Sequence, residues 1–346
     1  MSTTPAYHVT EAAAATCEDR AVAAWETCRV DLPGSGPEFR ARFRWMYLDN
    51  PAMPATLYLL DHGAEGRCVG FVTVAGRALR KDGESLLAGL LIDFVVDPAH
   101  RTAFPALMLQ RQAHQAGMRG KDFIYGIPDV KAMPIFKRLN CTFNLNIPRF
   151  VRPVRFGKYV ARKLPSWLAA PAGALIGVAD RVGAALGSRG CRGEWVSAFD
   201  ARFDQLWQAA TKPGCVVGRR DAAFLRWRFG APGPAMKIFA VSSGGTLHSY
   251  FVGRAEADAF VVKDVFSSAA GSTLDAALNS FVSAARDLGV NAISMSVLPD
   301  AELKRALAAT RFSERDHRVC FWTLSPERVE SLKGASWYLT PADEDM

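Results

Sequence analysis

The chain has 346 residues, 49% hydrophobic and 22% charged, which is typical of a globular protein with room for two domains. Its net charge is +8, from 42 basic and 34 acidic residues, and nearly all of the excess lies in one segment, which argues against a broadly basic nucleic-acid-binding protein. Seven cysteines are scattered singly, without a Cys-x-x-Cys pair, which argues against a zinc ribbon or a disulfide framework and suits a reducing compartment.

The elements predicted for the first half of the chain alternate between helices and strands. In chain order they are a helix at 43–47, strands at 56–60, 68–74 and 91–95, a helix at 105–118, a strand at 122–126, a short helix after Pro128 and Asp129, and a β-rich stretch at 142–151. Gly117 or Gly120 closes the long helix, because glycine commonly follows a helix C-terminus. Early hairpins followed by a crossover helix indicate a mixed α/β layer.

The second half of the chain repeats this order. Its elements are a helix at 225–229, strands at 237–241, 247–252 and 262–266, a helix at 273–288 closed by Gly289, a strand at 292–297, a short helix after Pro299 and Asp300, and a strand at 318–323. An Arg-Trp pair opens each copy, at 44–45 and at 226–227, and an aspartate lies in the third strand of each, Asp93 and Asp264. These matches in the same order indicate an internal repeat.

We interpret the chain as two tandem α/β domains, each a mixed central sheet flanked by helices. The predicted boundaries are an N-terminal segment at 1–24, a first domain at 25–155, a connector at 156–193, a second domain at 194–330 and a C-terminal tail at 331–346. We expect the Arg-Trp pairs to brace each domain, with Arg44 and Arg226 buried in salt bridges and the tryptophans in the core.

The excess positive charge is concentrated around the connector. Between Val151 and Arg192 there are eight basic residues and one acidic residue, Asp180. The apolar patches there leave three alternatives: a helix packed between the domains, an amphipathic segment on a membrane surface, or a transmembrane span, for which the many alanines and glycines are poorly suited. Residues 1–24 lack the features of a signal peptide. We therefore expect a cytoplasmic protein, with peripheral attachment of residues 151–192 to the anionic inner face of the membrane as one alternative.

The turn after the third strand of the first half points to a known family. The strand reads Ile-Asp-Phe-Val-Val-Asp-Pro at 92–98, and the turn reads His-Arg-Thr-Ala-Phe-Pro-Ala at 100–106. With the order of elements, this resembles the GNAT superfamily of N-acetyltransferases, whose signature is Arg/Gln-x-x-Gly-x-Gly/Ala. Arg101 and Ala106 match the signature, and Phe104 stands at its middle glycine. Over residues 25–345 the chain also resembles two-GNAT proteins found among bacterial polysaccharide and cell-envelope functions.

The resemblance implies that acetyl-CoA or another acyl-CoA binds where two central strands splay apart, with its pyrophosphate on the N-terminus of the following helix. Helix N-terminal N–H groups lack internal partners and attract anions. Because Phe104 adds bulk and Pro105 lacks an N–H, the turn is either a weakened CoA cradle or an ordinary strand-to-helix turn. The CoA-binding residues that the resemblance implies are Val95, Val96, His100, Arg101, Thr102, Ala103, Phe104 and Ala106. The equivalent turn of the second half, at 267–273, lacks the arginine, and we expect it to be structural or substrate-positioning.

Acyl transfer also needs a base for the acceptor and an acid for the leaving thiolate. The acid in GNAT proteins is often a tyrosine, but Phe136 stands at the corresponding position and cannot donate a proton. Tyr125 is a substitute candidate, with a core position as the alternative. Asp93, inside an apolar strand, is the candidate base, with a structural partnership to a buried arginine such as Arg44 as the alternative. No metal site is expected.

Three functions remain open from the sequence. The first is transfer of an acyl group from acyl-CoA to an amine or hydroxyl of a small-molecule or glycan-precursor acceptor, with no nucleic-acid partner. The second is aminoacyl transfer by an enzyme of the Fem type. Such enzymes also have paired GNAT-like folds and use aminoacyl-tRNA as the donor. The third is a non-catalytic scaffold in which both sites have decayed, which the replacements at Phe104 and Phe136 favour.

Overall fold

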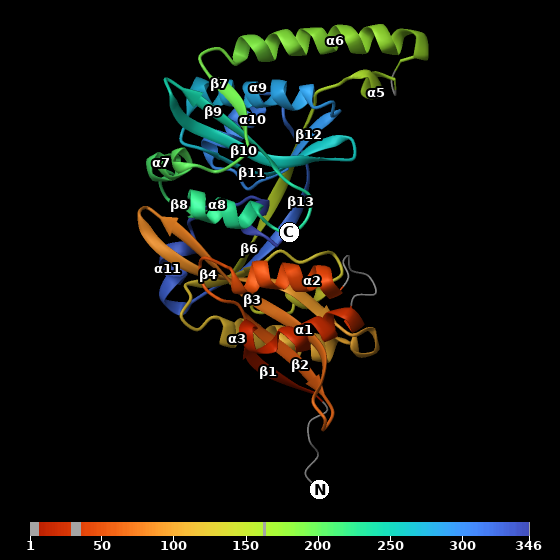
Figure 1. The fold of residues 1–346 in the computed structure, drawn as a ribbon, viewed down its shortest axis with the longest axis vertical. Coiled ribbons are helices and arrows are strands. Elements are labelled where there is room, and N and C mark those ends of the chain that lie inside the picture. Colours follow the sequence, from red (N-terminus) through yellow and green to blue (C-terminus); the bar gives the residue numbers. More distant parts are fainter. Residues whose placement is uncertain (1–6, 29–35, 162–163, 346) are drawn as a thin grey trace.

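A mixed β-sheet of 14 strands runs through both halves of the chain in this computed structural model, which describes residues 7–28, 36–161 and 164–345 (Figure 1). The strands are β1 (Tyr7–Ala13), β2 (Thr56–His62), β3 (Arg67–Lys81), β4 (Glu84–Val96), β5 (Phe123–Gly126), β6 (Phe143–Pro153), β7 (Arg192–Val196), β8 (Cys215–Gly218), β9 (Lys237–Ser243), β10 (Thr246–Glu256), β11 (Ala259–Ser267), β12 (Ala292–Ser296), β13 (Ser313–Leu324) and β14 (Ser336–Tyr338). The α-helices are α1 (Ala14–Cys28), α2 (Gly36–Phe43), α3 (Ala103–Gly117), α4 (Met133–Phe136), α5 (Gly157–Val160), α6 (Ser166–Gly187), α7 (Ala201–Ala209), α8 (Ala222–Phe229), α9 (Gly271–Asp287), α10 (Ala301–Ala309) and α11 (Val329–Leu332).

The order of strands in the sheet joins the two halves. It is β1-β2-β3-β4-β5-β13-β6-β12-β11-β10-β9-β7, with β8 bridging β14 and β3. The last long strand of each half is exchanged: β13 pairs with β5 of the first half, and β6 pairs with β12 of the second. The two exchanged strands also pair with each other. The strands predicted at 142–151 and 318–323 therefore exist, but each completes the half to which it does not belong in sequence.

The ends of the chain also belong to the sheet. Strand β1 pairs antiparallel with β2, so that part of the predicted N-terminal segment forms an edge of the sheet. Strand β14, in the predicted C-terminal tail, pairs with β8. The division into domains at 25–155 and 194–330 stays a prediction, because the sheet is continuous between them.

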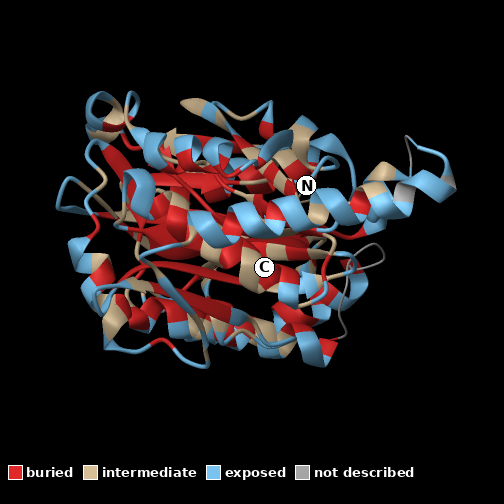
Figure 2. Ribbon diagram, turned by 90° about the horizontal axis from the view of Figure 1, so that it is seen from above, coloured by how far each residue is buried: buried red, intermediate tan, exposed pale blue. Residues whose placement is uncertain are grey.

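The two faces of the sheet are covered by different helices. Along β2, Leu57 and Leu59 lie in a core with α1, whereas Tyr58 and Leu60 lie in a second core with α3 on the other face. Successive side chains of a strand point to opposite faces, which explains why β2 is apolar throughout. Viewed from the end of the molecule, the buried residues form layers between exposed helices (Figure 2). The mixed, helix-flanked sheet expected from the sequence is confirmed.

Helix α6 is placed differently from the others. It lies across one end of the molecule, beside α9 and α5, and most of its residues are exposed (Figures 1 and 2). Within residues 7–28, 36–161 and 164–345, no helix has the length and the apolar character needed to span a membrane.

Candidate functional site

Strands β4 and β5 separate in the middle of the first half. They pair in parallel from Ala88 opposite Phe123 to Leu91 opposite Gly126, where their ladder ends. A pocket of about 230 Å³ lies beyond this point, between the diverging strand ends. Its lining residues are Trp25, Leu91, Ile92, Asp93, Phe94, Val95, Gln110, Ile127, Pro128, Asp129, Ala132, Phe136 and Asp345.

A β-bulge turns Asp93 toward this pocket. The register of β3 and β4 shifts between Phe71 and Thr73, and Asp93 has a positive φ of 51°. Aspartate is one of the few residues that adopts this backbone conformation readily. Sequence reasoning identified Asp93 as an unusual polar residue in an apolar strand, and the bulge is the physical reason that the strand accommodates it.

The carboxylate of Asp93 is held by two neighbours. It accepts hydrogen bonds from the guanidinium of Arg42 and the hydroxyl of Tyr47. Burial and Asp93 together raise the pKa of Tyr47 well above its usual range, so that Tyr47 is a donor in this pair. The arginine partner is thus Arg42 rather than Arg44, and the occupied carboxylate is a weaker candidate for a free base.

The expectation that Arg44 and Arg226 are buried in salt bridges is wrong. Both arginines are exposed: Arg44 donates to Glu18 at 2.9 Å, and Arg226 donates to the backbone carbonyl of Phe199 at 2.9 Å. The helix turns that carry them direct the neighbouring tryptophans inward instead, with Trp45 buried and Trp227 partly buried, so that the arginines point outward. Two positions away, Arg42 is partly buried and pairs with Asp93, and Arg228 is fully buried.

A second carboxylate, which sequence reasoning missed, lies in the same pocket. Asp345 reaches the pocket from the end of the chain, although it keeps contact with solvent. Partial desolvation, together with the nearby charge of Asp93, raises its pKa above the ordinary range of an aspartate. Its position in a polar tail offered no signal in the sequence, because the fold alone brings it beside β4.

The pocket also contains a buried amide without partners. Gln110 of α3 has no exposed surface, and neither its Oε1 nor its Nε2 atom finds a hydrogen-bond partner in the described part of the chain. A buried polar group that is left unpaired costs roughly 1–3 kcal/mol, so native proteins seldom keep one without a reason. The amide therefore offers an NH₂ donor and a carbonyl-oxygen acceptor to a group that enters the pocket.

The turn expected to hold phosphate is formed, but its arginine is folded back. Arg101 donates to the carbonyls of Val96 and Cys28, both at 2.8 Å, so that it ties the turn to the end of β4 and to α1. His100 shares a hydrogen bond with Tyr7 at 2.9 Å. Phe104 is 68% exposed and turned outward.

The remaining residues of the turn lie around the start of α3. Thr102 is the N-cap residue, and its side chain makes no capping hydrogen bond to the helix. Ala103 is exposed, Val95 and Val96 are buried at the end of β4, and Ala106 is buried in the first turns of the helix. The backbone geometry thus suits an anion at this helix N-terminus, with less help from Arg101 than the signature implies.

Tyr125 is a core residue and not part of the pocket. It is buried, stacks on Trp322 with ring centroids 4.7 Å apart, and donates its hydroxyl to the backbone carbonyl of Asp343 at 2.5 Å. Burial raises its pKa well above the usual range. Its side chain is packed in the core and does not line the pocket, so the geometry does not support a role as acid. Phe136 does line the pocket.

The corresponding place in the second half is filled. Strands β11 and β12 separate after Val262 and Met295, but the pocket there is only about 10 Å³. Tyr338 of β14 donates its hydroxyl to the carbonyl of Val265, and an ion pair between Lys212 and Asp300 lies beside it. The tail of the chain therefore closes this splay.

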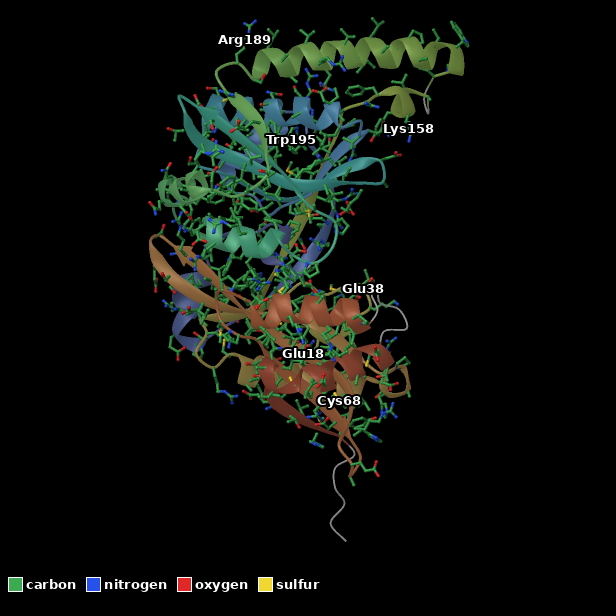
Figure 3. The ribbon with its side chains drawn as sticks, viewed as in Figure 1. Glu18, Glu38, Cys68, Lys158, Arg189 and Trp195 are labelled. Atoms are coloured by element: carbon green, nitrogen blue, oxygen red, sulfur yellow. The ribbon has the colours of Figure 1, made fainter. Side chains whose placement is uncertain are left out.

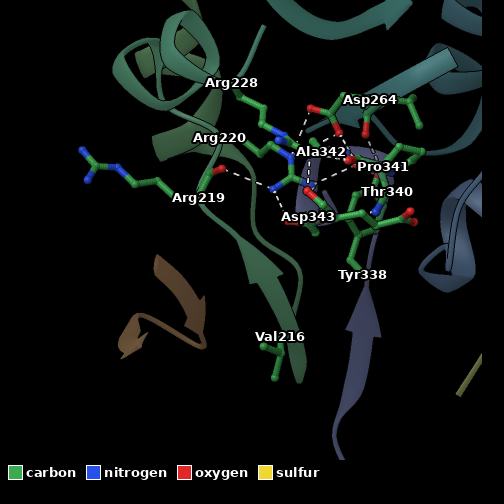
Figure 4. A network of polar contacts seen from close by, with 12 residues as sticks. Val216, Arg219, Arg220, Arg228, Asp264, Tyr338, Thr340, Pro341, Ala342 and Asp343 are labelled. Carbon is green, nitrogen blue, oxygen red and sulfur yellow. Dashed lines mark hydrogen bonds and ion pairs between the residues drawn. The ribbon is translucent and has the colours of Figure 1, made fainter. Parts of the chain in front are cut away.

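Asp264, the counterpart of Asp93, is fully buried in a polar network (Figure 4). It contacts Arg220 at 3.1 Å and accepts hydrogen bonds from Tyr250 and Thr340, both at 2.6 Å. Arg220 also pairs with Asp343 at 2.5 Å. These contacts are within the protein, so that Asp264 holds the tail in place.

The fold of the whole chain is similar to those of several solved proteins. A probable N-acyltransferase from Enterococcus faecalis V583 matches with a TM-score of 0.62 at 11% identity, over 92% of this chain and 72% of that one. A GCN5-related N-acetyltransferase from Anabaena variabilis ATCC 29413 matches with a TM-score of 0.59 at 11% identity, over 91% of this chain and 72% of that one. The chain has the GNAT fold.

The fold is also similar to that of an N-myristoyltransferase. Saccharomyces cerevisiae N-myristoyltransferase, solved with bound myristoyl-CoA, matches with a TM-score of 0.52 at 9% identity, over 94% of this chain and 80% of that one. No family model matches the sequence, and no curated protein matches it either. At these identities the GNAT likeness extends to the fold alone, and the chemistry depends on the residues of the pocket.

Proposed function

We propose that this GNAT-fold protein transfers an acyl group from acetyl-CoA or another acyl-CoA to an amine or hydroxyl, and that the pocket of the first half is its site. The observation that carries the proposal is the fully buried, unpartnered amide of Gln110 in a pocket at the β4–β5 splay. At the splay of β11 and β12 in the second half, the pocket is only about 10 Å³. The two halves are therefore assigned different roles, one catalytic and one structural.

The side chains of the pocket suit the steps of acyl transfer. The attacking group must lose a proton, and Asp345 is the better base because its pKa is raised and its carboxylate reaches solvent. Asp93, held by Arg42 and Tyr47, orients the bulge and adds negative charge. The Gln110 amide can donate to a carbonyl oxygen on which negative charge develops.

The charges of the pocket favour an amine as the acceptor. Asp93, Asp129 and Asp345 line it, and the structure describes no basic side chain among its lining residues. A protonated amine is attracted to such a site before it gives up its proton to a carboxylate. A glycan-precursor acceptor would then be an amino sugar rather than a neutral sugar.

Calorimetric titration of the purified protein with acetyl-CoA tests the site. Gln110→Leu should weaken binding by about tenfold, because one hydrogen-bonding group is lost in a buried site. The same change should raise the unfolding temperature of the free protein, since an unpaired amide is replaced by an apolar group. Gln112→Leu, an exposed change on the same helix, is the matched control and should alter neither value.

A negative titration would also be informative. If neither acetyl-CoA nor longer acyl-CoAs release or absorb heat at millimolar concentration, the site is not an acyl-CoA site. Salt-sensitive binding of aminoacyl-tRNA would then support the Fem-type alternative. If the protein binds neither acyl-CoA nor aminoacyl-tRNA, the scaffold hypothesis remains.

A further inference from the structure

Helix α6 carries its large apolar side chains on the outside. The residues of its buried seam are small or charged: Gly173, Asp180 and Ala184. The large apolar residues that face solvent include Trp167 (74% exposed), Leu175 (72%), Val178 (59%), Val182 and Leu186, and Leu168 and Ile176 are also exposed. This is the reverse of an ordinary surface helix, in which the apolar stripe faces the core.

The inner seam fixes the orientation of the helix. Asp180 pairs with three arginines: Arg152 at 3.1 Å, Arg311 at 3.3 Å, and Arg286 of α9. Removing one partner of a buried ion pair is strongly destabilising, so a rotation that exposed Asp180 to bury the apolar stripe would be unfavourable.

Close backbone packing adds to this restraint. A side chain at Gly173 would come within 3.0 Å of the backbone of Gly157, and one at Gly187 would come within 2.6 Å of Asn279. The helix therefore lies in direct contact with α5 and α9 along its inner seam. The outer stripe remains presented to the surroundings.

The exposed stripe is long and continuous. Positions 167, 175, 178, 182 and 186 fall within about a quarter of the helix circumference, at 100° per residue. A helix of 22 residues is about 33 Å long. We call this surface, made of Trp167, Leu175, Val178, Val182 and Leu186, the outer stripe.

Basic side chains lie at one edge and at the C-terminal end of the outer stripe. Arg181 is exposed at its edge, and Arg189 lies beyond its C-terminal end. Lys158 lies near the other end of the helix, where it forms an exposed ion pair with Asp258 at 2.6 Å, so that the positive charge is concentrated toward the C-terminal end of α6 (Figure 3). The only acidic residue between Val151 and Arg192 is Asp180, which is buried beneath the helix.

We propose that the outer stripe docks the protein onto an anionic membrane surface, with α6 lying in the plane of the membrane. An exposed apolar helix face with a tryptophan and a basic border is the composition that partitions into the boundary between lipid headgroups and acyl chains. Each basic residue near an anionic leaflet contributes about 1 kcal/mol. A second copy of this chain fits less well, because parallel pairing of α6 would bring the exposed Arg181 and Arg189 of the two copies together, whereas an anionic surface attracts both.

Flotation of the full-length protein with vesicles tests this proposal. Binding to phosphatidylcholine vesicles that contain phosphatidylglycerol should exceed binding to pure phosphatidylcholine, and should weaken as salt is added. The variant Leu175→Gln/Val178→Gln/Val182→Gln should lose binding at all salt concentrations. Arg181→Gln/Arg189→Gln should lower the partition coefficient on anionic vesicles by roughly 25-fold, which corresponds to two charges of about 1 kcal/mol each.

Matched controls distinguish binding through the outer stripe from nonspecific adsorption to vesicles. Val130→Gln removes an exposed apolar residue of the other half, and Lys333→Gln/Arg315→Gln removes two exposed basic residues away from α6. Neither should change flotation. Because the substituted residues are exposed, all variants should keep the unfolding temperature of the parent protein.

Three results would overturn the proposal. The first is no flotation with phosphatidylglycerol vesicles at low salt. The second is flotation that the apolar variant leaves unchanged. The third is a dimer of the parent protein in sedimentation that the apolar variant converts to a monomer, which would assign the outer stripe to a second copy. None of these results depends on acyl-CoA binding, so they leave the proposed function to its own test.

Discussion

The indole N–H of Trp45 donates to the backbone carbonyl of Trp227 at 2.6 Å, and the indole N–H of Trp227 donates to the carbonyl of Trp45 at 2.8 Å. Their rings are stacked with centroids 5.5 Å apart. These are the tryptophans of the two Arg-Trp pairs by which the internal repeat was identified. Each was expected to brace its own domain, but the reciprocal contact joins the two halves to each other.

Replacing one indole should weaken this contact. We expect Trp227→Phe to lower the free energy of unfolding by about 1–2 kcal/mol, because it removes one donated hydrogen bond and leaves the Trp45 carbonyl without that donor. A double-mutant cycle with Trp45→Phe should give a coupling of about 0.5–1.5 kcal/mol. Urea denaturation measures both values, and Trp195→Phe, at a half-exposed tryptophan, serves as the control. Purely additive effects would contradict a coupled pair.

The strand exchange predicts that neither half folds alone. A fragment ending at Gly190 contains β5 but lacks its neighbour β13, and the complementary fragment contains β12 but lacks β6. An unpaired strand edge is prone to aggregation. We expect each fragment to be insoluble or to unfold without cooperativity, and the two to form one soluble complex when expressed together. Circular dichroism during thermal unfolding distinguishes these outcomes, and a cooperative transition for either fragment alone would argue against the exchange.

Asp264 and Asp258 should differ greatly in their importance for stability. Asp264 is fully buried against Arg220, so Asp264→Asn leaves that arginine with one partner fewer and should cost about 3 kcal/mol. Asp258 forms an exposed ion pair with Lys158, and Asp258→Asn should leave the urea midpoint unchanged. Equal midpoints for the two variants would mean that the network in Figure 4 contributes little to stability.

The pH dependence of acyl transfer should identify the base. Because the pKa of Asp345 is raised, the group takes up its proton at a higher pH than an ordinary aspartate, and kcat/KM should fall as the pH is lowered through this raised pKa. Asp345→Asn should lower kcat/KM by about 10²–10⁴-fold and remove this acid limb, whereas Asp345→Glu should keep it. Asp93→Asn should retain the limb. The opposite pattern would assign the base to Asp93.

The outward position of Phe104 predicts a small effect on cosubstrate binding. Since its ring is turned away from the start of α3, Phe104→Gly should change the Kd for acetyl-CoA by less than about threefold. Titration calorimetry of the two proteins measures the ratio. A gain of tenfold or more would show that the ring obstructs the phosphate position, as the sequence signature first suggested.

Much of the fold follows from local patterns in the sequence. Apolar runs separated by glycine and proline predicted the strands and helices of both halves in the right order, and Gly120 and Gly289, with φ of 69° and 88°, lie after the two crossover helices as expected. The pairing partners of β6 and β13 could not be predicted from the sequence. An alternating apolar pattern indicates that a strand is buried but does not identify the strand beside it.

The candidate site was predicted only in part. Asp93 was recognisable because a carboxylate in an apolar run needs an explanation, and the turn at 100–106 because its residues follow a known signature. Gln110 and Asp345 were missed. A glutamine in a helix is ordinarily a surface residue, and an aspartate in a polar tail has no neighbours in sequence that reveal its place in the pocket.

The exchange of β6 and β13 also constrains how the protein is made. Strand β5 ends at Gly126, but the strand that covers its edge begins only at Ser313. A ribosome that adds about 5–20 residues per second leaves that edge uncovered for roughly ten seconds or more. During this interval the nascent first half is exposed to wrong pairing with other chains. Its yield in the cell should therefore depend on translation rate and on chaperones that bind unfinished sheets.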